Sequence, residues 1–180
     1  MIRRFLRNGA QKFGRRHGYD VSYMLHVIDG STAAGLRLAL FPLATQHAGP
    51  RTAGGLRAGA MLASTLDGDC GPCVQLVLDM ASEGGVPPEL LALCVEGRST
   101  EAGDVGLGFR FAQAAISGAP ELEALRDEIE KRHGADAVTA ASFAAASGRF
   151  YPVLKRGLGF AETCSRLRIG DRDVGVARQA

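Results

Sequence analysis

The sequence has little cysteine and lacks both a long apolar run and an acidic residue near its start. Its four cysteines are too few for the disulfide framework that holds many small secreted domains together. No apolar run reaches the ~18 residues of a membrane-spanning helix, and the first residues lack the apolar segment of a secretory signal. We therefore expect a cytoplasmic protein without a membrane partner.

The charge balance gives no general reason to expect a nucleic-acid partner, because the formal net charge is only +2. Hydrophobic residues make up 46% of the chain and charged residues 22%, as in an ordinary globular protein. The 180 residues are enough for one domain with a substantial core. We expect a basic N-terminal helix or arm in residues 1–18, a helical core in 19–168 and a polar tail in 169–180.

Apolar residues recur at helical spacing, and no stretch alternates convincingly as a strand would, so we predict an all-α fold. Glycine and proline mark most of the expected helix ends. Residues 33–44 are apolar on most sides, which predicts a buried helix, whereas the small residues of 135–150 suit close helix packing. Tyr151-Pro152 should kink or break the chain. The expected helices cover approximately residues 1–18, 20–28, 33–44, 51–66, 70–83, 86–95, 101–117, 120–133, 135–150 and 153–167.

A pair of cysteines stands where one of these helices should begin, in the stretch Asp69-Cys70-Gly71-Pro72-Cys73. Unpaired N–H groups and the helix dipole stabilise a thiolate at such a position, and the thiolate is the reactive form. Asp69 fits the N-cap position, and Gly71 permits unusual backbone angles. Pro72 is tolerated in a first turn because its missing N–H would lack a partner there. In a reducing compartment this pair indicates redox chemistry or metal binding.

A zinc site would need two further ligands, and the remaining cysteines do not provide a second pair. Cys94 and Cys164 stand alone in the sequence, so we expect no metal and no other cofactor. We interpret both as small buried hydrophobic residues. Thioredoxins also carry Cys-Gly-Pro-Cys, but their fold places a strand directly before the motif, and residues 59–66 indicate a helix.

Residues 56–94 resemble the alkylhydroperoxidase D-like, or carboxymuconolactone decarboxylase-like, family. The likeness rests on a helix, a short break, the cysteine segment 69–76 and a helix that ends at residues 84–86. Residues 149–155, with Leu158-Gly159 after them, also resemble the C-terminal helices of one subgroup. The resemblance covers most of residues 20–168, although only the cysteine helix is specific.

The resemblance implies an orthogonal helical bundle that assembles into trimers or hexamers. In the thiol branch of the family it implies reduction of a peroxide through Cys70 and Cys73, with a thiol reductant. That branch uses a glutamate and a histidine as a proton relay, and the corresponding positions here hold Ala58 and Val77. A base would have to come from elsewhere, and the histidines considered for this role are His26, His47 and His133.

Three functions remain open at this point. The first is a peroxidase-like, antioxidant thiol–disulfide oxidoreductase, in which one cysteine attacks a peroxide or partner disulfide and the other resolves the intermediate. The sequence does not assign these two roles. The second is a lyase or hydrolase acting on a small organic acid, as in carboxymuconolactone decarboxylases. Its carboxylate would bind to basic or polar side chains that are more simply surface groups: Arg51, Arg57, His47 and Lys155. The third is a non-catalytic helical oligomer with a redox-sensing cysteine pair.

Overall fold

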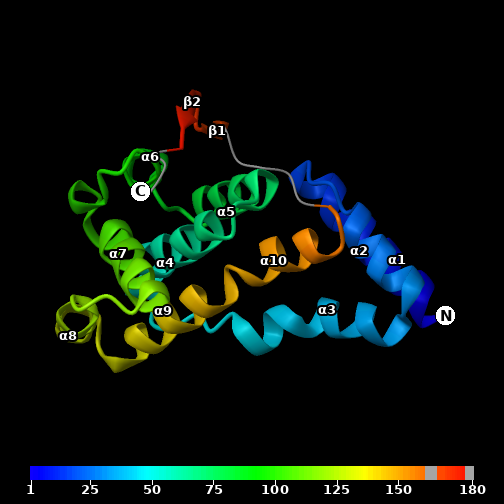
Figure 1. The fold of residues 1–180 in the computed structure, drawn as a ribbon, viewed down its shortest axis with the longest axis horizontal. Helices are drawn as coiled ribbons and strands as arrows, with labels where there is room; N and C mark the ends of the chain where they lie inside the picture. The colour runs from blue at the N-terminus through cyan, green and yellow to red at the C-terminus, as the bar shows by residue number, and fades with distance from the viewer. Residues whose placement is uncertain (161–165, 177–180) are drawn as a thin grey trace.

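The computed structural model describes residues 1–160 and 166–176, and this part of the chain is mainly helical (Figure 1). The all-α prediction is therefore confirmed in its general form. Glycines end several helices where the sequence predicted it, among them Gly84, Gly118 and Gly134. The helices are α1 (Ile2–His17), α2 (Ser22–Gly30), α3 (Thr32–Thr45), α4 (Gly54–Asp67), α5 (Gly71–Glu83), α6 (Pro88–Val95), α7 (Gly103–Ser117), α8 (Leu122–His133), α9 (Ala135–Ser147) and α10 (Phe150–Gly157).

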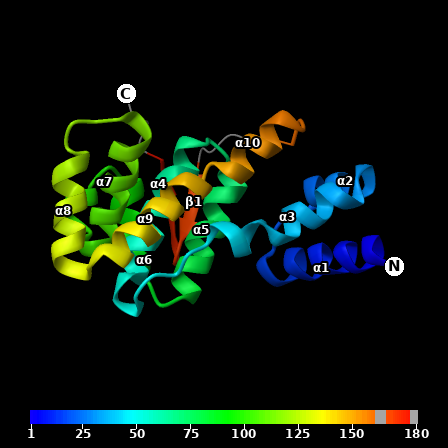
Figure 2. The same cartoon turned by 90° about the horizontal axis from the view of Figure 1, so that it is seen from below.

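The centre of the core lies where α4, α7 and α9 pack together (Figure 2). A Cβ atom on Gly59 of α4 would lie 1.8 Å from the carbonyl oxygen of Val105 in α7. One on Gly108 of α7 would lie 1.9 Å from the carbonyl oxygen of Leu56. The two backbones therefore touch, as glycine alone permits. α9 adds a face of buried alanines, which confirms the close packing predicted for residues 135–150.

The first three helices form an arm that extends away from this core (Figure 2). They pack mainly on one another, and α3 also reaches α9. The helix predicted over residues 33–44 forms, but the prediction that it is buried was wrong. Gly35 is the buried residue of α3, and Leu36, Leu40 and Leu43 are exposed. An apolar composition favours burial only where other elements surround the helix, and the core does not surround α3.

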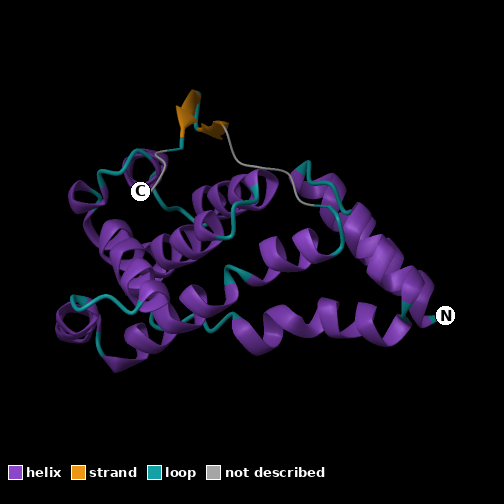
Figure 3. Ribbon diagram, in the orientation of Figure 1, coloured by secondary structure: helices purple, strands orange, loops and turns teal. Residues whose placement is uncertain are grey.

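The C-terminal region differs most from the prediction. α10 ends at Gly157, and residues expected to be the last helix and the polar tail include a hairpin of β1 (Arg166–Ile169) and β2 (Arg172–Gly175) (Figure 3). The strands pair antiparallel, with Leu167 opposite Val174, and both side chains are buried. The hairpin packs on α5 and α6. Each strand has only four residues, which is too short for the alternation to stand out in the sequence.

The break before α10 lies earlier than predicted. The chain leaves α9 at Gly148, and Arg149 occupies the N-cap position of α10. Pro152 lies in the first turn of α10 rather than breaking the helix, because a residue in the first turn needs no intrahelical partner for its N–H group.

Candidate functional site

The cysteine motif lies in the turn between α4 and α5. After α4 ends at Asp67, the backbone reverses through Asp69, which has a left-handed φ of 49°. Cys70, and not Asp69, occupies the N-cap position of α5, and among the described residues no side chain caps it. The N-cap prediction for Asp69 was therefore wrong. The turn needs a left-handed residue at this position, and aspartate tolerates that conformation better than most side chains.

Gly71 and Pro72 form the first turn of α5. Gly71 does not have a positive φ. The unusual backbone angle predicted for it is found at Asp69 instead. The placement of Pro72 in the first turn is confirmed. The backbone at Gly68 lies close to α10, because a Cβ atom there would lie 2.4 Å from the Cβ atom of Pro152. The motif is thus held between α5 and α10.

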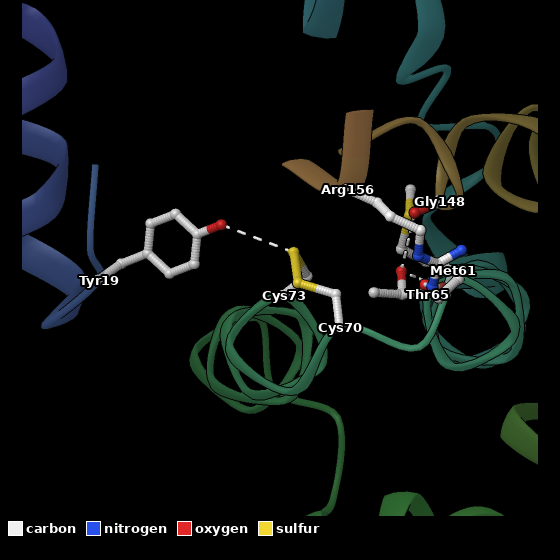
Figure 4. Close-up of a disulfide and its surroundings, with 8 residues drawn as sticks. Tyr19, Met61, Thr65, Cys70, Cys73, Gly148 and Arg156 are labelled. Atoms are coloured by element: carbon white, nitrogen blue, oxygen red, sulfur yellow. Dashed lines mark hydrogen bonds between the residues drawn. A yellow bond between two sulfur atoms is a disulfide. The ribbon is translucent and has the colours of Figure 1, made fainter. Parts of the chain in front are cut away.

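Cys70 and Cys73 form a disulfide across this turn, with their Cα atoms 5.3 Å apart (Figure 4). That separation is within the range of about 4.4–6.8 Å that disulfides usually span. The prediction that both sulfurs lie together at the helix start is therefore confirmed. Cys70 has no exposed surface and Cys73 is 4% exposed, so Cys73 is the member of the pair nearer to solvent.

A tyrosine from the arm contacts the disulfide (Figure 4). Tyr19, in the connection between α1 and α2, places its Oη atom 3.6 Å from the Sγ atom of Cys73. Because a disulfide sulfur carries no hydrogen, the phenol is the donor in this contact. On the opposite side of the pair, Arg156 of α10 donates to the carbonyl oxygen of Gly68 at 2.6 Å. The only side-chain donor shown on a sulfur in Figure 4 is therefore Tyr19.

A buried cation lies beside Tyr19. Lys155 of α10 is 2% exposed, and its Nζ atom lies 5.3 Å from the ring centre of Tyr19 and 5.4 Å from that of Tyr23. Hydrogen bonds from Ser22 lower the pKa of Asp20, and the charge of Lys155 makes a smaller contribution in the same direction. Among the described residues, the direct partners of the ammonium group are the two aromatic faces rather than a carboxylate. Lysine is seldom fully buried without an ionic partner, so this group marks the site as unusual.

Two tyrosines of this region, Tyr23 and Tyr151, are neutral phenols at physiological pH. Burial raises the pKa of Tyr23 well above its ordinary value, and the charge and hydrogen bond of the neighbouring Tyr19 act in the same direction. Burial also raises the pKa of Tyr151 to about 12. The site thus combines a disulfide, a cation and hydroxyl groups that remain available as donors.

None of the contacts described for the two relay positions, or for the neighbouring carboxylates Asp67 and Asp79, involves a sulfur of the cysteine pair. Ala58 and Val77 are partly buried and pack against the core. Asp67 forms an ion pair with Arg149 at 2.8 Å, and Asp79 accepts a hydrogen bond from the side chain of Gln75. A relay of the glutamate–histidine kind is therefore not built from these residues.

The three candidate histidines also have other partners. The Nε2 atom of His47 lies 2.7 Å from the carboxylate of Asp136, and that of His133 lies 3.2 Å from Asp104. His26 packs against an aromatic ring, with the two ring centres 5.5 Å apart. None of the contacts described for these histidines involves a cysteine.

Sequence reasoning missed Tyr19 and Tyr23, and it placed Lys155 on the surface, which the structure contradicts. Arg51 and His47 are exposed, as expected of surface groups. No local pattern could have found the site around Cys73, because Tyr19 lies 54 residues away in the sequence. Only the tertiary packing of α10 and the arm brings these groups together.

Of the two isolated cysteines, the described residues include only Cys94. Cys94 is buried, as predicted, and burial raises its pKa to about 12. Cys164 lies outside the described residues. Cys94 thus serves as an internal example of a buried thiol that stays protonated and inert.

Within residues 1–160 and 166–176, no group of three or more histidine, cysteine or acidic side chains is placed to hold a metal ion. In the same ranges, no helix combines the length and the apolar character needed to cross a membrane. No protein-family model, curated protein or solved structure matches the chain. The function is therefore argued from the site itself.

Proposed function

We propose that the protein is a thiol–disulfide oxidoreductase of the peroxidase-like type that uses Cys70 and Cys73. The observation that supports this most directly is the disulfide at the start of α5, with a phenol hydroxyl on Cys73. Two sulfurs in one helical turn can form and break their bond without moving other elements. The helix start also favours a thiolate once the bond is reduced.

Cys73 takes the attacking role in this proposal, because it is nearer to solvent and contacts the hydroxyl of Tyr19. Its thiolate attacks one peroxide oxygen, the O–O bond breaks, and the other oxygen leaves as an alcohol or water after taking a proton. The product on Cys73 is a sulfenic acid. The Cys70 thiol then attacks that sulfur and expels water, which forms the disulfide. An external dithiol returns two electrons and two protons and is itself oxidised to a disulfide.

The burial of the pair points to a small substrate. Cys70 is fully covered and Cys73 nearly so, so a bulky protein disulfide has little access to either sulfur. A hydroperoxide presents its reacting oxygens at one end of the molecule and needs only a narrow approach. We therefore favour a small peroxide over a partner protein as the oxidant.

The test is peroxide consumption in the presence of a dithiol, with hydrogen peroxide and an organic hydroperoxide as substrates. The wild-type protein is expected to turn over repeatedly. Cys73→Ser should fall to the background rate. Cys70→Ser, treated with peroxide in the absence of the dithiol, should consume one equivalent and hold a sulfenic acid on Cys73 that dimedone traps for mass spectrometry. Cys94→Ser is the matched control and should retain the wild-type rate. Wild-type rates in both motif variants would refute the proposal.

The family and the assembly belong to the same proposal. We infer an orthogonal bundle of the alkylhydroperoxidase D-like type that acts in the cytoplasm as a homo-oligomer, a trimer or hexamer. The support for an oligomer is apolar surface that the monomer leaves open. Phe5 of α1 and the stripe Leu36, Leu40 and Leu43 of α3 are exposed. A groove of about 570 Å³ lies next to that stripe, lined largely by apolar side chains of α3, α9 and α10, among them Phe41.

A redox-sensing role is the second candidate, and the burial of both sulfurs favours it. In that case, forming or breaking the disulfide would change the stability of the contact between the arm and α5, and the protein would not consume a substrate. Thermal unfolding of the oxidised and the dithiol-reduced protein separates the two functions. A sensor would show different melting temperatures and no peroxide consumption above the background.

A further inference from the structure

Cys73 and Cys94 are both buried, but they have different surroundings. Cys94 and Cys73 are 2% and 4% exposed, so desolvation would disfavour a thiolate at either position. In Cys94 that effect raises the pKa to about 12, and the charge of Arg110 only partly opposes it. Cys73 has, in addition, a helix start, the hydroxyl of Tyr19 and a nearby buried cation.

Tyr19 connects that cation to the sulfur. Its ring faces the Nζ atom of Lys155. Its hydroxyl contacts the Sγ atom of Cys73 (Figure 4). A positive charge near a phenol makes its hydroxyl a stronger hydrogen-bond donor, and hydrogen bonds to a charged acceptor are stronger than those between neutral groups. In the oxidised protein this donor faces a neutral sulfur. Its hydrogen bond becomes stronger when the disulfide opens and the sulfur becomes a thiolate.

We propose that Tyr19 and Lys155 form the anion site of the reduced cysteine pair. The Tyr19 hydroxyl donates a hydrogen bond to the Cys73 thiolate, and Lys155, held between the rings of Tyr19 and Tyr23, supplies the opposite charge. Tyr19 touches the reacting sulfur, whereas Lys155 acts through Tyr19 as a positioning and electrostatic residue. The inference rests on the proposed function, since it names the groups that take the place of the missing relay.

The reduction step balances with a dithiol as the electron donor. The S–S bond breaks, and the dithiol gives two electrons and becomes a disulfide. Of its two protons, one goes to Cys70 and one to solvent, so that Cys73 remains a thiolate. Cys73, the more exposed residue of the pair, is thereby the nucleophile for the next peroxide.

Other ionisable groups around the pair come from each neighbouring element. Asp20 lies before α2 and Tyr23 lies in its first turn, whereas Tyr151, Lys155 and Arg156 belong to α10. Asp69 precedes the pair in the chain, and its carboxylate disfavours a nearby thiolate. Arg156 donates to the carbonyl oxygen of Gly68 rather than to a sulfur. Among these groups, the direct donor to Cys73 is Tyr19.

The experiment measures the ionisation of Cys73 in a Cys70→Ser, Cys164→Ser background. The pH dependence of iodoacetamide labelling, followed by mass spectrometry, gives the midpoint for Cys73, with Cys94 as the internal reference. The parent is expected to have a midpoint below about 8.5, the ordinary value for cysteine. Tyr19→Phe, which keeps the ring and removes only the hydroxyl, should raise the midpoint by about one pH unit.

Variants at Lys155 and Tyr151 test whether the charge of Lys155 lowers the ionisation midpoint of Cys73. Lys155→Met should raise the midpoint as Tyr19→Phe does, and Lys155→Arg should restore part of the effect by returning the charge. Tyr151→Phe, which removes the hydroxyl of a half-buried residue of α10 without a described contact to the sulfur, should leave the midpoint unchanged. Circular dichroism checks that each variant folds.

Two results would overturn the inference: a parent midpoint at or above about 8.5, or a Tyr19→Phe midpoint equal to that of the parent. Both are independent of turnover. Loss of peroxide consumption in the wild-type protein refutes the proposed function, whereas an unperturbed thiol refutes only the anion site. The two failures are therefore distinguishable.

Discussion

At the scale of single residues, the contact between α4 and α7 depends on an absent side chain. Gly59 lies where α4 and α7 touch, and a Cβ atom there would lie 1.8 Å from a carbonyl oxygen. Because a backbone atom cannot rotate away as a side chain can, Gly59→Ala must push the two helices apart. We expect a loss of about 1–3 kcal/mol in the free energy of unfolding, or more, measured by urea denaturation.

Gly9→Ala is the matched control for this substitution. Gly9 lies in the middle of α1, and a Cβ atom there would meet nothing within 4 Å. The higher helix propensity of alanine should stabilise the protein by up to about 1 kcal/mol. Equal unfolding free energies for Gly59→Ala and the wild type would show that the helices do not approach as closely as described.

The residues of the site divide by how far apart they lie in the sequence. Cys70 and Cys73 share one turn, so their spacing alone predicted that the sulfurs meet. Tyr19 and Lys155 come from opposite ends of the chain, and nothing in the residues around either of them indicates the other. Lys155 even resembles a surface cation in its sequence context. Such contacts depend on the packing of the arm and α10, which composition and periodicity do not describe.

At the scale of elements, the side chain of Gln75 hydrogen-bonds α5 to the hairpin. The side-chain amide of Gln75 donates to the carbonyl oxygen of Arg168 at 2.7 Å and accepts from its N–H group at 2.8 Å. Gln75→Ala removes both bonds, each of which contributes about 1 kcal/mol. We expect amide hydrogen exchange in residues 166–176 to become faster by about 5–30-fold.

The control at this scale is Ser82→Ala on the same helix. The Ser82 hydroxyl donates to the carbonyl oxygen of Leu78 within α5 and does not bridge to the hairpin. Its removal should leave exchange in residues 166–176 unchanged. If Gln75→Ala has no more effect than Ser82→Ala, the apolar contacts of Leu167 and Val174 hold the hairpin without the amide.

Elements also differ in how well the sequence predicts them. The helices follow from apolar spacing over ten or more residues and from glycine or proline at their ends, and these signals are local. The hairpin was missed because each strand offers only two alternations. The predicted burial of α3 was wrong for another reason. α3 has the composition of a buried helix, but the core does not surround it. Local sequence predicts the type of an element better than its neighbours.

At the scale of the whole molecule, the exposed side of α3 calls for a covering surface. Leu36, Leu40 and Leu43 follow one another at helical spacing and are 43%, 48% and 83% exposed. Contiguous apolar surface of this kind marks an interaction site in most folded proteins. A second copy of the chain offers a complementary partner, because every copy carries both this stripe and the adjacent apolar groove lined by Phe41 and Val153.

Leu40→Glu with Leu43→Glu should therefore dissociate the proposed oligomer, because each carboxylate would lose its hydration in the interface. Light scattering after size-exclusion chromatography should give a trimer or hexamer for the wild type and a monomer for the double variant. Met80→Glu is the control, since Met80 is a 44% exposed apolar residue on α5 rather than on α3. A wild-type monomer at micromolar concentration would contradict the assembly and leave the leucine stripe of α3 as a surface for some other partner. A double variant that stays oligomeric would show that the interface lies on a different face.

Peroxide turnover of the dissociated variant, measured in the same preparation, then decides whether the site of Cys73, Tyr19 and Lys155 is complete within one chain, as its contacts indicate.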